Sequence, residues 1–220
     1  MKSILTMTVV GALALSARGQ TATNTVSVSV GLAIPDGDPN GLASSTTLSG
    51  LGNISSVSVS LDITGGYDGD LYAYLAGPAG QFAVLLNRVG VGTGQPSGYA
   101  NAGFNITLSD TGSDIHTSGG SFTLGGGAVT GNYQADGRNI DPQSSPSAFD
   151  SAGTAYLSSF DSTSGDGEWS LFIADLSGGG QSTLESWGLT VITVVPEPQT
   201  WAMLGGGLVL FSCFRRRSNF

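Results

Sequence analysis

Acidic residues two positions apart are the side chains of this sequence most able to do chemistry. Two nearby carboxyl groups can hydrolyse a glycosidic bond when one is protonated and the other is ionised. They can also hold calcium, which takes six to eight oxygen ligands. We therefore expect one or two calcium sites, with glycoside hydrolysis as a less favoured alternative. The candidate ligands are Asp36 and Asp38, Asp68 and Asp70, and Asp166 and Glu168.

The first pair lies in Asp36-Gly37-Asp38-Pro39-Asn40-Gly41, which matches the first half of an Asp-x-Asp-x-Asn-Gly calcium loop. Thr47 stands where that loop has its bidentate glutamate, and a turn rich in Asp, Asn and Gly is the alternative reading. In the other two pairs the acids share one face if they lie on a strand. They can then converge on a cation or cap a turn.

The single histidine, His116, is the other residue that invites a catalytic interpretation. A serine hydrolase needs an imidazole base, a nucleophile within its reach and an oxyanion hole. His116 lies in a loop-like stretch next to Gly119-Gly120, and the sequence has no Gly-x-Ser-x-Gly motif. We therefore expect a solvated loop histidine, no catalytic residues, and a protein that is not an enzyme.

The C-terminal residues fall into three parts: a short motif rich in proline, an apolar stretch and a basic cluster. They begin with Val195, Pro196, Glu197 and Pro198, continue with an apolar stretch at 201–214, and end in Arg215, Arg216 and Arg217. Fourteen helical residues span about 21 Å, which is less than the roughly 30 Å hydrocarbon core. Arginines stay on the cytoplasmic side of a membrane. The tail thus reads as a short or temporary transmembrane anchor, or alternatively as a buried helix of a soluble domain.

This tail resembles the PEP-CTERM sorting signal of Gram-negative bacteria, and we assign residues 194–220 to it. In that family an exosortase-type transpeptidase is thought to recognise the tail and to cut near the Pro-Glu-Pro motif. The resemblance implies a transient stay in the inner membrane and then a place on the outer surface or in the extracellular matrix. Whether the mature form keeps the tail is left open.

The N-terminus agrees with export. Lys2 precedes an apolar run at 4–15 and then small residues, which is the order of a secretory signal peptide recognised by the secretion machinery. Ala17 and Gly19 favour a cut before Gln20, so we assign residues 1–19 to the signal, although a cut elsewhere between Ser16 and Ala22 is also consistent with the pattern.

The part between the two signals is strongly acidic. It keeps fifteen of the sixteen acids but only Arg88 and Arg138 of the seven basic residues, which is a formal charge of −13. Such a charge excludes nucleic acid as a partner, because binding it requires basic residues that neutralise phosphates. The only cysteine, Cys213, lies in the tail, so no disulfide can form within this part of the chain.

Two-residue alternation of apolar and polar side chains, separated by glycine-rich turns, predicts an all-β domain over residues 20–193. Such a pattern is typical of an antiparallel β-sandwich. The stretch 112–166 is expected to form long loops with short strands such as 121–124. The main predicted strands are 25–30, 55–63, 71–75, 82–86, 104–108, 169–173 and 187–191.

Three segments resemble the P domain (P/Homo B domain) of the proprotein convertases. They are Ala33-Ile34-Pro35-Asp36, residues 54–80 around Gly69-Asp70-Leu71, and residues 167–191 with Trp169, Asp175, Leu184 and Trp187. The family usually has a histidine where this chain has Gly65-Gly66. The resemblance implies a jelly-roll-like sandwich that accompanies a subtilisin-like serine endopeptidase without cutting.

Together these features predict an exported, non-catalytic surface or matrix protein whose sandwich binds polysaccharide or a surface protein. Tyr67, Tyr72, Tyr74 and Tyr133 are candidate rings for stacking on sugars, although sheet packing is an equal alternative for Tyr72 and Tyr74 on one strand face. An accessory module of a separate protease is the second hypothesis, and an independent glycoside hydrolase is the third.

Overall fold

A computed structural model describes residues 20–195. The predicted signal peptide at 1–19 and the tail from Pro196 onward, including Glu197, Pro198 and the three arginines, lie outside the described residues. Val195 is the last residue of the last strand. The strands are β1 (Gln20–Ala33), β2 (Asp38–Leu48), β3 (Asn53–Gly65), β4 (Leu71–Ala76), β5 (Phe82–Asn87), β6 (Gly103–Ser109), β7 (Ser113–Asp114), β8 (Thr123–Gly125), β9 (Ala128–Gln134), β10 (Gly167–Asp175) and β11 (Ser182–Val195).

Four short 3-10 helices complete the described part of the chain. They are η1 (Asp68–Asp70), η2 (Gly119–Ser121), η3 (Pro146–Asp150) and η4 (Leu157–Phe160). No helix within residues 20–195 has the length and apolar character needed to cross a membrane.

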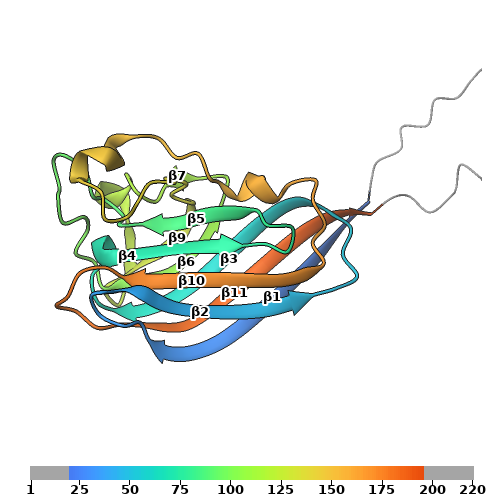
Figure 1. Cartoon of the computed structure of the whole chain (residues 1–220), viewed down its shortest axis with the longest axis horizontal. Helices are drawn as coiled ribbons and strands as arrows, with labels where there is room; N and C mark the ends of the chain where they lie inside the picture. Colours follow the sequence, from blue (N-terminus) through green and yellow to red (C-terminus); the bar gives the residue numbers. More distant parts are fainter. Residues whose placement is uncertain (1–19, 196–220) are drawn as a thin grey trace, which may run out of the picture. The chain divides into compact units, whose positions relative to one another are not determined.

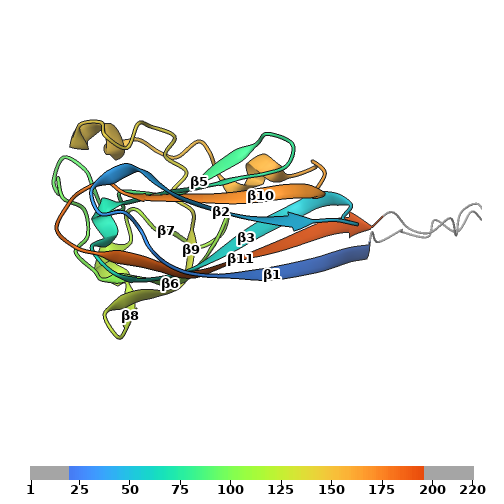
Figure 2. The ribbon, with the colours of Figure 1, turned by 60° about the horizontal axis from the view of Figure 1, so that its bottom comes forward.

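The strands form two sheets, and the larger one has the order β1-β11-β3-β6-β9-β7, with β8 paired to β9. The smaller sheet has the order β2-β10-β4-β5 and lies in front of the larger one (Figure 1). Residues 21–195 form one compact unit. The prediction of an all-β fold is therefore confirmed, and its arrangement is that of two sheets packed face to face (Figure 2).

Alternation in the sequence explains which face of each sheet is buried. In β3 the side chains of Val57, Val59, Leu61 and Ile63 are buried, whereas the residues between them are half-buried or exposed. The same period of two buries every second residue of β4. Trp169 and the other inward side chains of both sheets thus form one continuous hydrophobic core.

All seven predicted main strands are present, but two long strands were missed. β2 begins with Asp-Pro-Asn-Gly, within the segment predicted to be half of a calcium loop or a turn, and its remaining residues include few large apolar side chains. β9 lies in the stretch that was expected to be mostly loops. The predicted short strand at 121–124 is replaced by η2 and by β8 at Thr123–Gly125. The larger sheet is also not wholly antiparallel, because β9 pairs with β6 and β7 in parallel.

Candidate ligand-binding site

The six predicted acidic ligands do not meet at one place. Strand β10 pairs with β2 so that Asp175 lies opposite Asp38, whereas Gly167 lies opposite Leu48. At about 3.3 Å per residue, these two ends of β10 are roughly 26 Å apart. Asp166 and Glu168 are therefore at the opposite end of the sandwich from Asp38, and a single site made from all six residues does not form.

The segment that matched half of a calcium loop contains the start of a strand. β2 begins at Asp38, whose Oδ1 accepts hydrogen bonds from the backbone N–H and side-chain amide of Asn40, at 2.9 and 2.8 Å. Both carboxylate oxygens of Asp36 are 3.2 Å from the backbone nitrogen of Gly179, which donates to them. These two acids thus hold local backbone in place.

The other two pairs do not share strand faces. Asp166 precedes β10 and accepts a hydrogen bond from the backbone N–H of Leu51 at 2.7 Å, while Glu168 lies within the strand. Asp68 and Asp70 belong to η1 instead of a strand. The spacing therefore does not bring the two side chains of either pair onto a common face.

Asp68 is the most unusual of these acids. Its side chain is completely buried, its Oδ1 accepts a hydrogen bond from the backbone N–H of Gly103 at 2.9 Å, and its Oδ2 has no partner among the described residues. Burial raises the pKa of Asp68 to about 8, against the lowering effect of the Gly103 hydrogen bond. Because Asp68 is inaccessible, it cannot contact a substrate from this position.

Carboxylates do approach one another at the end of the sandwich that carries Asp36. Burial, together with the nearby charges of Asp70 and Asp36, raises the pKa of Asp175 to about 6, against the lowering effect of hydrogen bonds from Ser177 and Ser182. Burial also raises the pKa of Asp70. Even so, no group of three or more His, Cys, Asp or Glu side chains within residues 20–195 is placed to hold a metal ion. Calcium binding therefore stays a prediction of the sequence.

His116 is buried, so the prediction of a solvated loop histidine is wrong. Its Nδ1 lies 2.7 Å from Oδ2 of Asp136, and its Nε2 lies 2.8 Å from the carbonyl oxygen of Val91. Only 3% of His116 and none of Asp136 is exposed. Because a carbonyl oxygen only accepts, Nε2 must carry a proton and donate it. Both ring nitrogens are thus engaged in contacts that join separate loops.

Arg138 completes this buried network. Its guanidinium donates hydrogen bonds to Asp114 at 3.1 Å, to Asp136 at 3.2 Å and to the carbonyl of Phe149 at 3.0 Å. Burial lowers the pKa of Arg138, but the charges of Asp136 and Asp114 outweigh that effect and raise it. No pattern in the sequence indicates this cluster, because its members come from separate segments, among them β7 with Asp114 and η3 with Phe149, and follow no common strand period.

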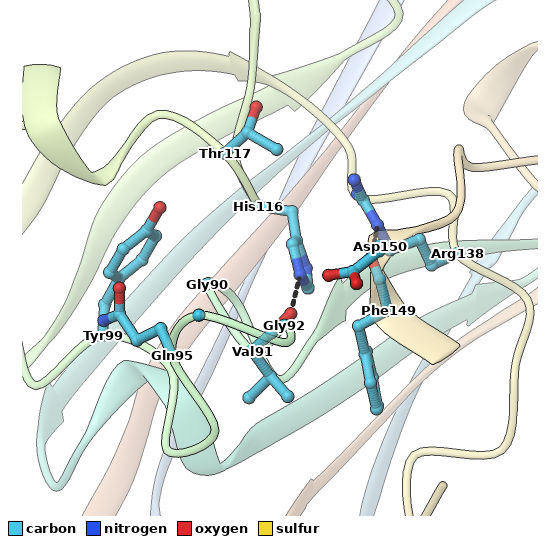
Figure 3. A pocket seen from close by; sticks show the side chains of 11 residues that line it. Gly90, Val91, Gly92, Gln95, Tyr99, His116, Thr117, Arg138, Phe149 and Asp150 are labelled. Carbon is cyan, nitrogen blue, oxygen red and sulfur yellow. Dashed lines mark hydrogen bonds between the residues drawn. The ribbon is translucent and has the colours of Figure 1, made fainter. Parts of the chain in front are cut away.

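A cavity of about 530 Å³ opens beside this network. Figure 3 shows His116 between Tyr99 and Gln95 on one side and Phe149 and Asp150 on the other. Its volume is within the roughly 300–1,000 Å³ range of small-molecule sites. The cavity is therefore large enough for a ligand of one or a few small rings.

The polar groups left free in the cavity favour hydroxyl groups over anions. The charge of Arg138 is paired with Asp114 and Asp136, and both ring nitrogens of His116 are engaged by protein groups. Asp150 accepts hydrogen bonds from the backbone N–H and hydroxyl of Thr93, at 3.0 and 2.6 Å, and these bonds lower its pKa. An ionised carboxylate retains further lone pairs for hydroxyl donors.

The candidate aromatic residues differ in how accessible their rings are to a ligand. Tyr133 is buried, and its hydroxyl donates to the carbonyl of Thr130 at 3.0 Å, so it is not available to a ligand. Tyr72 and Tyr74 are half-buried on the outer face of the smaller sheet, where Tyr74 stacks on Phe172 with ring centroids 5.0 Å apart. Tyr67 is 46% exposed and lines a smaller hollow of about 290 Å³ beside Asp70.

No protein-family model matches this chain, and no curated protein matches it either. Two solved structures of the serine protease of Aeromonas sobria are similar to it, one of the protease in complex with a chaperone and one of the protease alone, at 16% and 15% identity. The matches cover 80% and 82% of this chain with TM-scores of 0.45 and 0.44. The chain spans only 28% of the length of those protease chains. A likeness this weak carries no argument about function.

Proposed function

We propose that this chain is an exported, non-catalytic protein of the bacterial surface or extracellular matrix, and that its sandwich binds an uncharged polysaccharide. The observation that carries the binding proposal is the cavity beside His116, where the Arg138 guanidinium is paired with Asp114 and Asp136 and the free groups suit hydroxyls. An acidic chain also repels anionic polymers, which favours an uncharged ligand.

The absence of catalysis is supported by the position of His116. A general base needs a free ring nitrogen within reach of a nucleophile. Here Nδ1 is bound to Asp136 and Nε2 to the carbonyl of Val91. Of the predicted carboxylate pairs, Asp68 is buried away from solvent and Asp166 is bound to the backbone of Leu51. These contacts favour a structural role for each group.

The route of export rests on the two terminal segments. The signal-peptide pattern and the Val-Pro-Glu-Pro tail with its arginine cluster support sorting by an exosortase-type system. The P/Homo B resemblance and the all-β structure support a P-domain-like, jelly-roll-like binding module. The mass of the protein released from the envelope tests this route: we expect a form that begins near Gln20 and lacks the arginine cluster. A mature form that retains residues 215–217 would refute tail processing.

Polysaccharide binding is tested by affinity electrophoresis of the full-length chain through gels that contain uncharged or anionic polysaccharides. We expect retardation by an uncharged polymer, weakened at least tenfold by Asp150→Asn. Asp141→Asn is the matched control, because Asp141 is an exposed acid outside the cavity lining. If Asp150→Asn leaves the retardation unchanged, the polysaccharide does not bind in this cavity. Recovery of a stoichiometric protease from the envelope, without glycan binding, would favour the accessory-module hypothesis instead.

A further inference from the structure

Two edge strands of the sandwich lie on the same side of the molecule. β1 is the first strand of the larger sheet, and β2 is the first strand of the smaller one. In Figure 1 both strands run along the lower edge of the sandwich, and the short connection 34–37 joins them. β1 has 14 residues, which is long for an edge strand, and an edge presents unpaired backbone N–H and C=O groups to its surroundings.

The edge at the other side of the smaller sheet is protected differently. Backbone groups of β5 are hydrogen-bonded by a long loop: Val84 donates to Ala155, and Asp136 and Gly137 donate to Leu85 and Val84, at 2.9–3.1 Å. Among residues 20–195, no loop makes comparable backbone hydrogen bonds along β1 or along residues 42–48 of β2. The β1–β2 side is thus unprotected in the described structure, in contrast to the β5 edge.

The hydrophobic core is also incomplete on this side. Eight partly buried apolar residues pack against the core, and five of them belong to β1 or β2. A residue at the closed side, such as Val84 of β5, is by contrast completely buried. We call these five residues the β1–β2 seam: Val26, Val28, Val30, Leu42 and Leu48.

The charge pattern indicates what can cover the seam. β1 contains no ionisable residue, and β2 contains only Asp38 at its start, although residues 20–193 carry a formal charge of −13. A basic partner would be drawn to the acidic surfaces instead. A partner that is itself acidic is repelled by the charged surfaces of this chain. It can therefore approach at the strands that carry almost no charge. A second copy of this chain meets that condition.

We propose that two copies of this chain associate through the β1–β2 seam, with β1 of one copy antiparallel to β1 of the other. A twofold axis perpendicular to both sheets brings identical edges together, as an isologous interface requires. The larger sheet then continues across both copies, and the seam residues of each copy are covered by those of the other. This inference is independent of the proposed ligand and of the sorting tail.

The association state of the full-length chain, purified in a neutral detergent and studied by density-matched sedimentation equilibrium, tests the proposal. We expect a reversible dimer at micromolar concentrations. Ser27→Lys with Ser29→Lys places charges along β1 at exposed positions, without touching the core, and is expected to weaken the dimer at least tenfold. The matched control is Ser58→Lys with Ser60→Lys on the central strand β3, which should leave the dimer intact.

A second measurement locates the contact. In a Cys213→Ser background, a single cysteine is placed in turn at Thr25, Ser27 and Ser29. Each variant should form disulfide-linked dimers, and the position that lies nearest the twofold axis should do so most readily. Cysteine at Ser58 should not, because β3 is flanked by β11 and β6. A chain that stays monomeric up to 100-fold above micromolar concentration, or a dimer that the β1 lysines do not weaken, would overturn the proposal.

Discussion

The carboxyl group of Asp68 should make the stability of this protein fall as the pH rises. Burial raises its pKa in the folded state to about 8, against an ordinary value of 3.8. The folded state therefore keeps a proton that the unfolded chain releases, and the unfolding free energy decreases wherever the folded state binds more protons. The contribution of the protonated Asp68 carboxyl to the unfolding free energy is fully present below about pH 4 and is lost as the pH rises to about 8.

The size of the effect follows from the shift. A difference of about four pKa units corresponds to at most about 6 kcal/mol, at about 1.4 kcal/mol per unit. That is a large part of the 5–15 kcal/mol typical of a whole domain. Asp68→Asn removes the titration but keeps an oxygen that can accept the hydrogen bond from Gly103. We expect this variant to be more stable than the unaltered protein by only about 1–2 kcal/mol at pH 5, where a small part of the linkage has been lost, and by several kcal/mol at pH 9.

Urea unfolding at pH 5, 7 and 9 measures the difference. Asp62→Asn makes the same chemical change at a half-buried position of β3 and is the matched control. Asp175, whose pKa burial raises to about 6, contributes in the same direction but only between about pH 4 and 6. The reasoning fails if Asp68→Asn and the unaltered chain lose stability in parallel between pH 7 and 9.

Three further outcomes are expected. Arg138→Met should lower the unfolding free energy by about 3–5 kcal/mol in urea, because it removes the guanidinium that pairs with Asp114 and with the buried Asp136, whereas Arg88→Met should cost clearly less; equal losses would contradict the network. Gly103→Ala should destabilise by at least about 1 kcal/mol, since φ is +95° and a Cβ would collide with the carbonyl of Ile63; an unchanged melting temperature would contradict this. Calcium binding remains a prediction of the sequence. Millimolar calcium should raise the melting temperature of the chelated chain, and Asp70→Asn should reduce this rise. If the melting temperature does not rise at all, the calcium prediction is wrong.

The sequence by itself was enough to predict the fold class and most of the strands. Alternation along residues 55–63 puts Val57, Val59, Leu61 and Ile63 on one face whatever the strand pairs with, because the period of two is a local property of extended backbone. The missed strand β2 shows the limit of this rule. Its small and polar side chains are compatible with a turn, and pairing with β10 decides in favour of a strand.

Only the tertiary structure decided which chemical groups meet. His116 and Asp136 are twenty residues apart in loops without periodicity, so nothing local indicated that they form a buried pair. For the acid pairs, the spacing suggested convergence within each pair, but Asp166 precedes β10 while Glu168 lies in it, and Asp68 and Asp70 belong to η1 instead of a strand. Side-chain convergence depends on how loops and strands pack across the core, and that packing is a long-range property that spacing along the chain does not encode.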